Sequence, residues 1–335
     1  MRYFIYLIVC LWPLMAASQD WEDRRLFLGE TGRKNLRVLS STDTSFFAPI
    51  IEQYLAQNPD LNVEYVVTGT SNLDNVFRQN PDQFDVVISS AMDLQFKLAN
   101  DGFSLRIDQV ATPDWAQWRQ SLFAFTTEPA AIVINRAAFA GETMPNSRQE
   151  LIEALRARPD IFRDKLGTYD VRRSGLGYLF ATQDARTSET YWRLMEVMGG
   201  LGTHLYCCSG EMIDDLAEGK IVVAYNVLGS YANARRDVAD KIEIILPSDF
   251  PTTMMRSALV SKHAPQQQAA VDFLRHLISR RTRDDDQAIF QMPALNTEPN
   301  DSQQSIIALE PALLTYLDFL KRQKFIQAWE DAIIQ

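Results

Sequence analysis

The feature that most constrains the fold is a strand–turn–helix pattern that occurs three times in succession near the start of the chain. In the first copy an apolar strand beginning at Leu36 runs into five small polar residues, and apolar residues then resume at helical spacing from Phe46 to Leu55. The strands and turns of the three copies are 36–39 with 40–44, 61–67 with 68–72, and 84–88 with 89–92. Because successive strand–helix units form a parallel sheet with right-handed crossovers, we expect the three turns along one edge of one sheet.

These turns are rich in hydroxyl groups, and each precedes a helix. The first backbone N–H groups of a helix have no partner within it, so a turn of this kind can hold an anionic or polar ligand. Helix capping is the simpler role for the same side chains. We predict ligand contacts from the following residues of the three turns: Ser41, Thr42, Asp43, Thr70, Ser71, Ser90 and Ala91.

The remainder of the chain predicts a second α/β lobe. Strand and helix patterns continue after a crossing near Phe125 to Ala130, and the chain returns near Tyr225 to Tyr231. We expect a hinged clamp that closes on a ligand between two sheet edges. The predicted division is lobe 1 from 36–125 and 230–295, lobe 2 from 126–229, and C-terminal helices at 305–335 packed on the body.

A turn with two arginines is the main candidate site of the second lobe. Arg172 and Arg173 precede Ser174 and Gly175, which open a helix. A guanidinium can bind a phosphate or carboxylate through two parallel hydrogen bonds. Adjacent side chains of an extended segment face opposite ways, so one arginine is expected to reach the cleft. The segment from Tyr225 to Tyr231, where the chain returns to the first lobe, is expected to reach the cleft as well. The predicted ligand contacts here are Arg172, Arg173, Ser174, Gly175, Tyr225, Asn226 and Tyr231.

The N-terminus has the pattern of a secretory signal peptide over residues 1–18. Arg2 precedes an apolar run from Tyr3 to Leu14, and small residues follow at 16–18. We therefore expect a periplasmic protein, exported and not membrane-spanning, and a monomer. The net charge of −10 at pH 7 argues against a nucleic-acid partner, because such binding relies on clustered Lys and Arg.

No pattern indicates catalysis or a bound cofactor. The three histidines, His204, His263 and His276, are scattered and lack the spacing of metal ligands or of a catalytic dyad. There is no Gly-rich phosphate loop of the nucleotide-binding type. We expect no catalytic residue, no cofactor and no resident metal. The adjacent Cys207 and Cys208 can close a vicinal disulfide in an oxidising compartment, although a structural or incidental role is the simpler interpretation.

The order of elements resembles that of the type II periplasmic solute-binding proteins of ABC transporters. The resemblance lies in the hydroxyl turn after the first strand and in the segments FDVVISS, INRAAF, EGKIVVAYNVLGSYA and ALVSKHAPQQQAAVDFLRHLIS. Within that class the chain is similar to the ferric-ion-binding group and, more specifically, to the phosphoglycerate transport regulatory proteins. The resemblance implies a two-lobed α/β fold with a ligand cleft at the hinge.

The resemblance also implies the partners: an ABC permease or a membrane-bound sensor kinase. The ferric group holds iron with paired tyrosines, whereas Tyr231 follows Ser230 here. Iron(III) prefers several hard anionic ligands, so we place iron below a phosphorylated or carboxylated metabolite. We expect a non-enzymatic receptor for uptake; the alternatives are a sensor acting on a two-component kinase, a ferric-ion-binding protein and a secreted enzyme.

Overall fold

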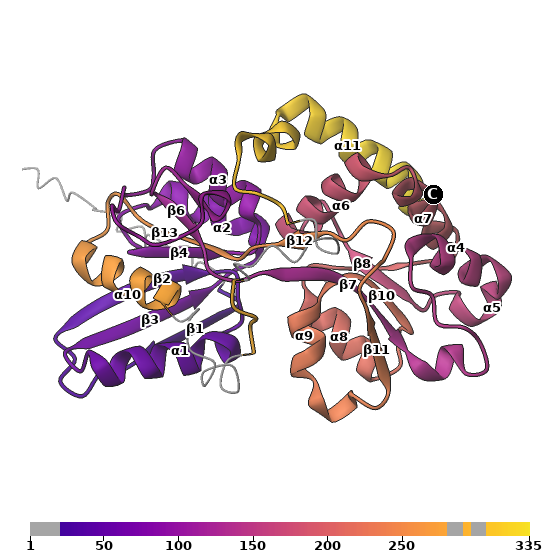
Figure 1. The fold of residues 1–335 in the computed structure, drawn as a ribbon, viewed down its shortest axis with the longest axis horizontal. Helices are drawn as coiled ribbons and strands as arrows, with labels where there is room; N and C mark the ends of the chain where they lie inside the picture. Colours follow the sequence, from indigo (N-terminus) through magenta and orange to yellow (C-terminus); the bar gives the residue numbers. More distant parts are fainter. Residues whose placement is uncertain (1–20, 280–290, 296–305) are drawn as a thin grey trace, which may run out of the picture.

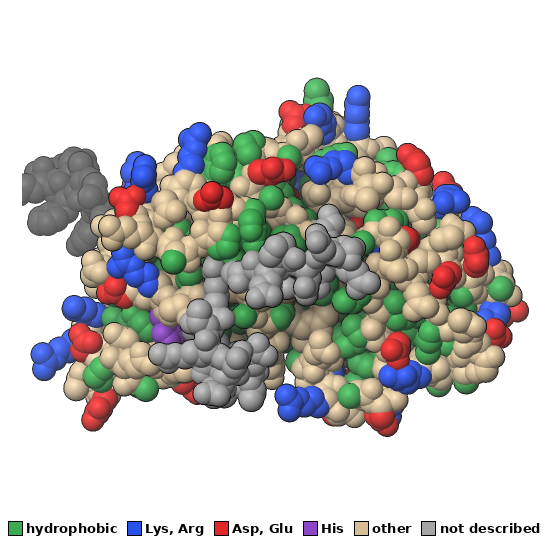
Figure 2. Space-filling model, in the orientation of Figure 1, with side chains coloured by type: hydrophobic (Ala, Val, Ile, Leu, Met, Phe, Trp, Pro, Cys, Tyr) green, Lys and Arg blue, Asp and Glu red, His purple; other side chains and the backbone are tan. Residues whose placement is uncertain are grey.

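The computed structural model describes residues 21–279, 291–295 and 306–335, so the predicted signal peptide lies outside the described residues. Figure 1 shows two α/β lobes side by side, each with helices above and below a sheet. Figure 2 shows acidic and basic side chains interspersed around the outer edges of both lobes on this face. Within the described residues, no helix combines the length and apolar character needed to cross a membrane.

The first lobe is built on a seven-stranded sheet of order β1-β3-β2-β4-β13-β6-β5. Its centre is parallel, because β2 pairs in parallel with both β3 and β4, as the repeated units predict. The strands are β1 (Asp23–Phe27), β2 (Lys34–Ser40), β3 (Leu61–Val67), β4 (Val86–Ser89), β5 (Gln117–Trp118), β6 (Leu122–Ala124) and β13 (Ser257–Val260). The helices of this lobe are α1 (Thr44–Gln57), α2 (Thr70–Gln79), α3 (Met92–Asn100) and α10 (Gln267–Ser279).

The second lobe is built on a six-stranded sheet. Five strands follow the order β11-β7-β10-β8-β9, and β12 pairs with the start of β7. The strands are β7 (Glu128–Asn135), β8 (Leu166–Tyr169), β9 (His204–Tyr206), β10 (Val223–Leu228), β11 (Ile242–Ile245) and β12 (Thr253–Met254). The helices are α4 (Arg148–Ala157), α5 (Pro159–Phe162), α6 (Gly175–Thr187), α7 (Thr190–Gly200), α8 (Ser209–Ala217) and α9 (Gly229–Ala234).

The second crossing between the lobes differs from the predicted one. The chain leaves the second sheet after β12 and enters the first at β13, so the crossing lies near residues 255–256 and not near Tyr225 to Tyr231. Strand β11, which the predicted division assigns to lobe 1, pairs antiparallel with β7 in the second sheet. An apolar pattern predicts a strand but does not specify the strand with which it pairs. Here β11 pairs with the edge of β7 that would otherwise be exposed.

The C-terminal segment contacts both lobes, as Figure 1 shows along the upper side of the molecule. Its 3₁₀ segment η6 (Pro311–Leu317) packs on α3 of the first lobe, and α11 (Phe319–Ile333) packs on α7 of the second. Trp329 of α11 is 1% exposed. The hydroxyl of Tyr178 in α6 donates to the carbonyl of Tyr316, 2.6 Å away, and so joins η6 to the second lobe.

A buried carboxyl lies at the start of α3, close to this C-terminal segment. Asp93 is 3% exposed, and burial raises its pKa to about 7. The folded state therefore prefers the protonated carboxyl. This preference contributes stability that is complete below the ordinary pKa of 3.8 and is lost as the pH rises through about 7.

We predict that Asp93→Asn reduces the loss of stability between pH 4 and pH 8, because the amide has no charge to bury. The variant should gain about 2–4 kcal/mol over the parent protein at pH 8, with little difference at pH 4. Urea unfolding at several pH values measures this. The exposed Asp108→Asn is the matched control and should leave the dependence of unfolding free energy on pH unchanged. An Asp93→Asn variant whose unfolding free energy falls with pH as much as that of the parent protein would contradict the prediction.

Candidate functional site

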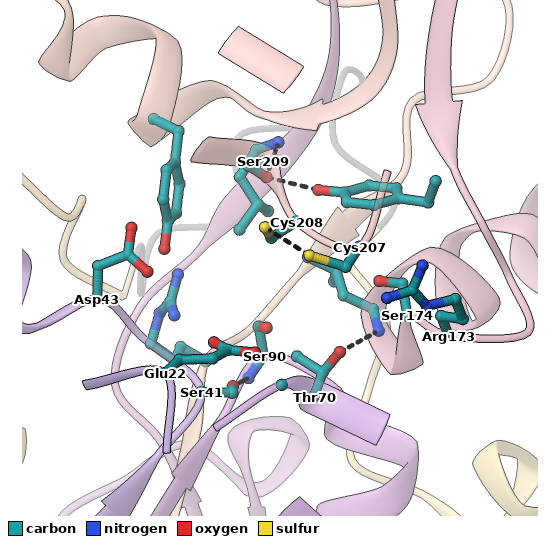
Figure 3. A pocket seen from close by; sticks show the side chains of 16 residues that line it. Glu22, Ser41, Asp43, Thr70, Ser90, Arg173, Ser174, Cys207, Cys208 and Ser209 are labelled. Atoms are coloured by element: carbon teal, nitrogen blue, oxygen red, sulfur yellow. Dashed lines mark hydrogen bonds between the residues drawn. The ribbon is translucent and has the colours of Figure 1, made fainter. Parts of the chain in front are cut away.

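A cavity of about 60 Å³ lies between the two sheets, with room for several water molecules. Figure 3 shows that side chains from both lobes converge on it. We call it the interlobe cavity. Its lining residues are Glu22, Ser41, Asp43, Gly69, Thr70, Ser90, Tyr169, Arg173, Ser174, Leu176, Cys207, Cys208, Ser209, Leu228, Tyr231 and Arg256.

The first lobe contributes the three predicted turns. They follow β2, β3 and β4, whose carboxyl ends lie at one sheet edge because the strands are parallel. The hydroxyl of Ser41 lies 3.1 Å from that of Ser89 and accepts from the backbone N–H of Ser90 at 3.3 Å. The side chain of Asp43 does not cap α1, although the residue occupies the N-cap position, so this carboxyl is left to face the cavity.

The second lobe contributes the arginine turn, which touches the first lobe directly. Ser71 donates through its hydroxyl to the carbonyl of Arg173, with an O···O distance of 2.5 Å. Thr70 Oγ1 accepts from the first two N–H groups of α6, those of Gly175 at 2.9 Å and Leu176 at 3.3 Å. A Cβ on Gly175 would lie only 3.2 Å from the backbone of Thr70, so glycine allows this approach. The lobes are therefore closed on each other at this turn.

The two arginines lie on opposite sides of their segment. Arg172 forms ion pairs with Asp170 at 2.8 Å and with Glu330 of α11 at 3.1 Å, away from the cavity. Arg173 lines the cavity beside Ser174, which caps α6 by accepting from the N–H of Gly177. Residues 171–173 form a turn in which the N–H groups of Arg173 and Ser174 donate to the carbonyl of Asp170, so the turn, and not the predicted extended segment, separates the two arginines.

Half of the predicted contact residues line the cavity: Ser41, Asp43, Thr70, Ser90, Arg173, Ser174 and Tyr231. Tyr231 also packs against Phe46 of α1, with ring centroids 4.6 Å apart. The structure places the other predicted residues behind or beside the lining: Thr42, Ser71, Ala91, Arg172, Gly175, Tyr225 and Asn226. Ligand binding by the lining residues stays a prediction.

Tyr225 and Asn226 belong to a buried network of the second lobe. Both donate to the carboxylate of Asp184 at 2.8 Å, and Arg148 donates to the hydroxyl of Tyr225 at 2.7 Å. Arg148 also pairs with Asp184 at 3.2 Å, and both are fully buried. Because these side chains satisfy one another, they leave no group for a ligand in the cavity.

The centre of the site is an ion pair that the sequence analysis missed. Arg256, at the second crossing, donates from Nε and Nη2 to the two carboxylate oxygens of Glu128, at 2.9 and 3.0 Å. Both side chains are at most 1% exposed. Arg256 also donates to the hydroxyl of Thr42, and Glu128 accepts from Thr126 at 2.8 Å and Ser230 at 2.6 Å. Both crossings and the first turn therefore meet at one guanidinium, and that guanidinium lines the cavity.

Further lining residues that the sequence did not predict include Glu22 at the start of the described chain, Tyr169 on β8 and Ser209 on α8. Glu22 lines the cavity, and burial, followed by the charges of Asp43 and Glu211, raises its pKa. Burial also raises the pKa of Asp43, and the positive charge of Arg256, which lowers that pKa, has a smaller effect. The hydroxyls of Tyr169 and Ser209 lie 2.5 Å apart. Each of these residues stands in an ordinary local pattern, so the sequence carried no signal for them.

Helix N-termini account for much of the electrostatic character of the cavity. The lining contains residues at or just before the first residue of α1, α2, α6 and α8, and it contains Ser90, two residues before α3. The N-terminal end of a helix carries partial positive charge, and Arg173 and Arg256 add formal positive charge. These groups favour an anion, whereas the carboxyl groups of Glu22 and Asp43 favour parts of a ligand that donate hydrogen bonds.

Comparison with known proteins agrees with this architecture. The family described as bacterial extracellular solute-binding protein matches residues 40–283. The substrate-binding protein of an ABC transporter from Agrobacterium tumefaciens is 30% identical, with a TM-score of 0.86, over 93% of this chain and 98% of that one. A search of curated proteins gave no match.

Two more distant structures share the fold alone. The periplasmic binding protein AfuA from Actinobacillus pleuropneumoniae, with fructose-6-phosphate bound, is 13% identical with a TM-score of 0.68, over 90% of this chain and 99% of that one. Iron-bound HitA from Pseudomonas aeruginosa is 12% identical with a TM-score of 0.66, over 89% and 99%. The predicted type II binding-protein fold is confirmed, whereas the phosphoglycerate regulatory subgroup has no support among these matches.

We predict that Arg256→Met destabilises the protein by about 3–5 kcal/mol, because it leaves the carboxylate of Glu128 buried without its partner. The double variant Arg256→Met/Glu128→Leu should cost less than the sum of the two single variants, since it removes both charges. Urea unfolding of the four proteins measures the coupling. As a control, Arg106→Ala removes the exposed ion pair with Asp108 and should cost at most about 1 kcal/mol. Additive costs for Arg256 and Glu128 would contradict the prediction.

Proposed function

The chain belongs to the bacterial extracellular solute-binding proteins of ABC transporters, and from that premise we propose that it captures a small anionic metabolite in the interlobe cavity for uptake through an ABC permease. The observation that carries the proposal is the convergence of the side chain of Arg173 and the N-terminal ends of α1, α2, α6 and α8 on one cavity. The partial positive charge of helix N-termini and a guanidinium both favour phosphate and carboxylate groups.

The acidic side of the cavity narrows the class of ligand further. Glu22 and Asp43 face the cavity, and a carboxylate there accepts hydrogen bonds from alcohol groups. Hydroxyls from Ser41, Thr70 and Ser90 line the same space. An anion that also carries hydroxyl groups, such as a phosphorylated or carboxylated polyol, fits both sides. AfuA, which shares the fold, is described with fructose-6-phosphate bound.

Ferric iron fits the cavity less well. Tyr231 is the lining phenol that the ferric-group resemblance singles out. Burial raises the pKa of Tyr231 above its usual range, which opposes the phenolate form that iron(III) requires. Arg256 adds a positive charge to the same wall. Sensing through a membrane kinase has no specific observation behind it, so transport is the function we propose.

Closure of the lobes is the step that holds the solute. Thr70 and Ser71 of the first lobe bond to the arginine turn of the second, so the lobes cannot separate without breaking these hydrogen bonds. A ligand that touches both sides of the cavity stabilises the closed arrangement through its own contacts. Opening at the two crossings then releases it to the permease.

We predict that Arg173→Ala weakens binding of the ligand about 10- to 100-fold, because a charge-assisted hydrogen bond to the anion is lost. A thermal-shift screen of phosphorylated and carboxylated metabolites, with Fe³⁺ included, identifies the ligand by a rise in Tm. Isothermal titration calorimetry with the compound that gives the largest rise then measures the Kd of each variant.

Arg172→Ala is the matched control, because this neighbouring arginine is paired with Asp170 and Glu330 outside the cavity. Its affinity for the ligand should stay within about twofold of the parent protein. Equal losses in both variants would show a general effect of charge and contradict direct contact by Arg173. A screen in which every anion leaves Tm unchanged would contradict the proposed function itself.

A further inference from the structure

Two adjacent cysteines open onto the interlobe cavity. Cys207 and Cys208 connect β9 to α8, and Figure 3 shows their sulfur atoms facing each other. The sulfurs lie 2.8 Å apart, and both thiols are free. Adjacent side chains on a regular strand point to opposite faces, so the turn into α8 is what brings both thiols to one side.

A carboxylate completes this group. Cys207 Sγ donates to Oε2 of Glu211, 3.5 Å away, and one ligand atom from each of Cys207, Cys208 and Glu211 lies within 4.8 Å of the other two. Glu211 is exposed and both cysteines are partly exposed, so the group is accessible to an ion from solvent. Two sulfurs and a carboxylate oxygen are a donor set that zinc accepts.

The charges around the thiols favour a cation. Glu211 of α8 and Glu22 of the first lobe bring negative charge close to the thiols, and Glu22 lines the same cavity. A divalent cation would compensate this charge and take the place of the thiol protons.

We propose that Cys207, Cys208 and Glu211 form a binding site for a thiophilic divalent cation of the Zn²⁺ class at the wall of the interlobe cavity. Bonds of about 2.3 Å from the ion to each sulfur in a tetrahedral site require the sulfurs to move roughly 1 Å apart, which rotation of the side chains supplies. The site does not rest on the anionic ligand proposed above, because none of its three residues belongs to the arginine turn or to the serine and threonine turns.

Titration of the reduced, metal-free full-length mature protein with Zn²⁺ alone tests this site. The thiols are first reduced and counted, and the titration is then run without oxygen. We expect one Zn²⁺ per chain, a fall in the number of thiols that react with a thiol reagent from two to none, and an affinity that rises with pH because the ligands must lose protons. Cys207→Ser and Cys208→Ser should each weaken binding at least tenfold, and Glu211→Gln about tenfold.

Asp214→Asn is the matched control, since this acidic residue lies on the same helix but outside the group. It should leave the Zn²⁺ affinity unchanged. Zn²⁺ binding that survives in Cys207→Ser/Cys208→Ser, or thiols that stay reactive when Zn²⁺ is bound, would overturn the assignment. None of these outcomes bears on the anion screen, so the two proposals fail separately.

Discussion

The structure depends most on one buried charge. Arg256 lies between the lobes, and burial of a guanidinium is tolerated only where its donors are satisfied. Glu128 satisfies two of them from the first crossing, and Thr42 satisfies a third from the turn after β2. Three segments far apart in the sequence are therefore held at one point. The turns on either side of the cavity are positioned relative to that point, and the guanidinium itself forms part of the cavity wall.

The wall of the cavity combines groups of different chemistry. Arg173 and Arg256 contribute positive charge, Glu22 and Asp43 contribute carboxyl groups, and Cys207 and Cys208 contribute thiols. The proposed hydroxylated anion would contact Arg173 directly and the carboxyl groups through its alcohol groups, so its binding would be coupled to closure of the lobes. The proposed thiophilic cation would bind Cys207, Cys208 and Glu211, which all belong to the second lobe.

Much of the first lobe could be predicted from periodicity. The three strand–turn–helix units determine a parallel sheet, and a parallel sheet places Ser41, Thr70 and Ser90 at one edge. The sequence also predicts that only one of Arg172 and Arg173 reaches the cavity, although a turn, and not an extended segment, separates them. The second lobe was harder, because Tyr225 and Asn226 follow a strand much as the cavity residues do, yet they point into a network around the buried Asp184. The sequence pattern of a strand does not show whether its polar side chains face the cavity or a buried network within the lobe.

Contacts between distant segments are what the sequence could not reveal. Arg256 and Glu128 are each single charges in apolar surroundings, 128 positions apart, and β11 has the same apolar pattern whichever sheet it joins. Cys207 and Cys208 are conspicuous in the sequence, but their place beside Glu22 follows only from closure of the lobes. These features depend on tertiary packing, which overrides local preference.

The most direct measurement is a crystal structure of the protein purified from its native host without denaturation, so that any natural ligand is retained. The account predicts electron density for an anionic solute inside the interlobe cavity, in contact with Ser41 or Ser90 of the first lobe and with Arg173 of the second. Density for the solute at another place, or in contact with one lobe only, would contradict the claim that the two lobes close on it.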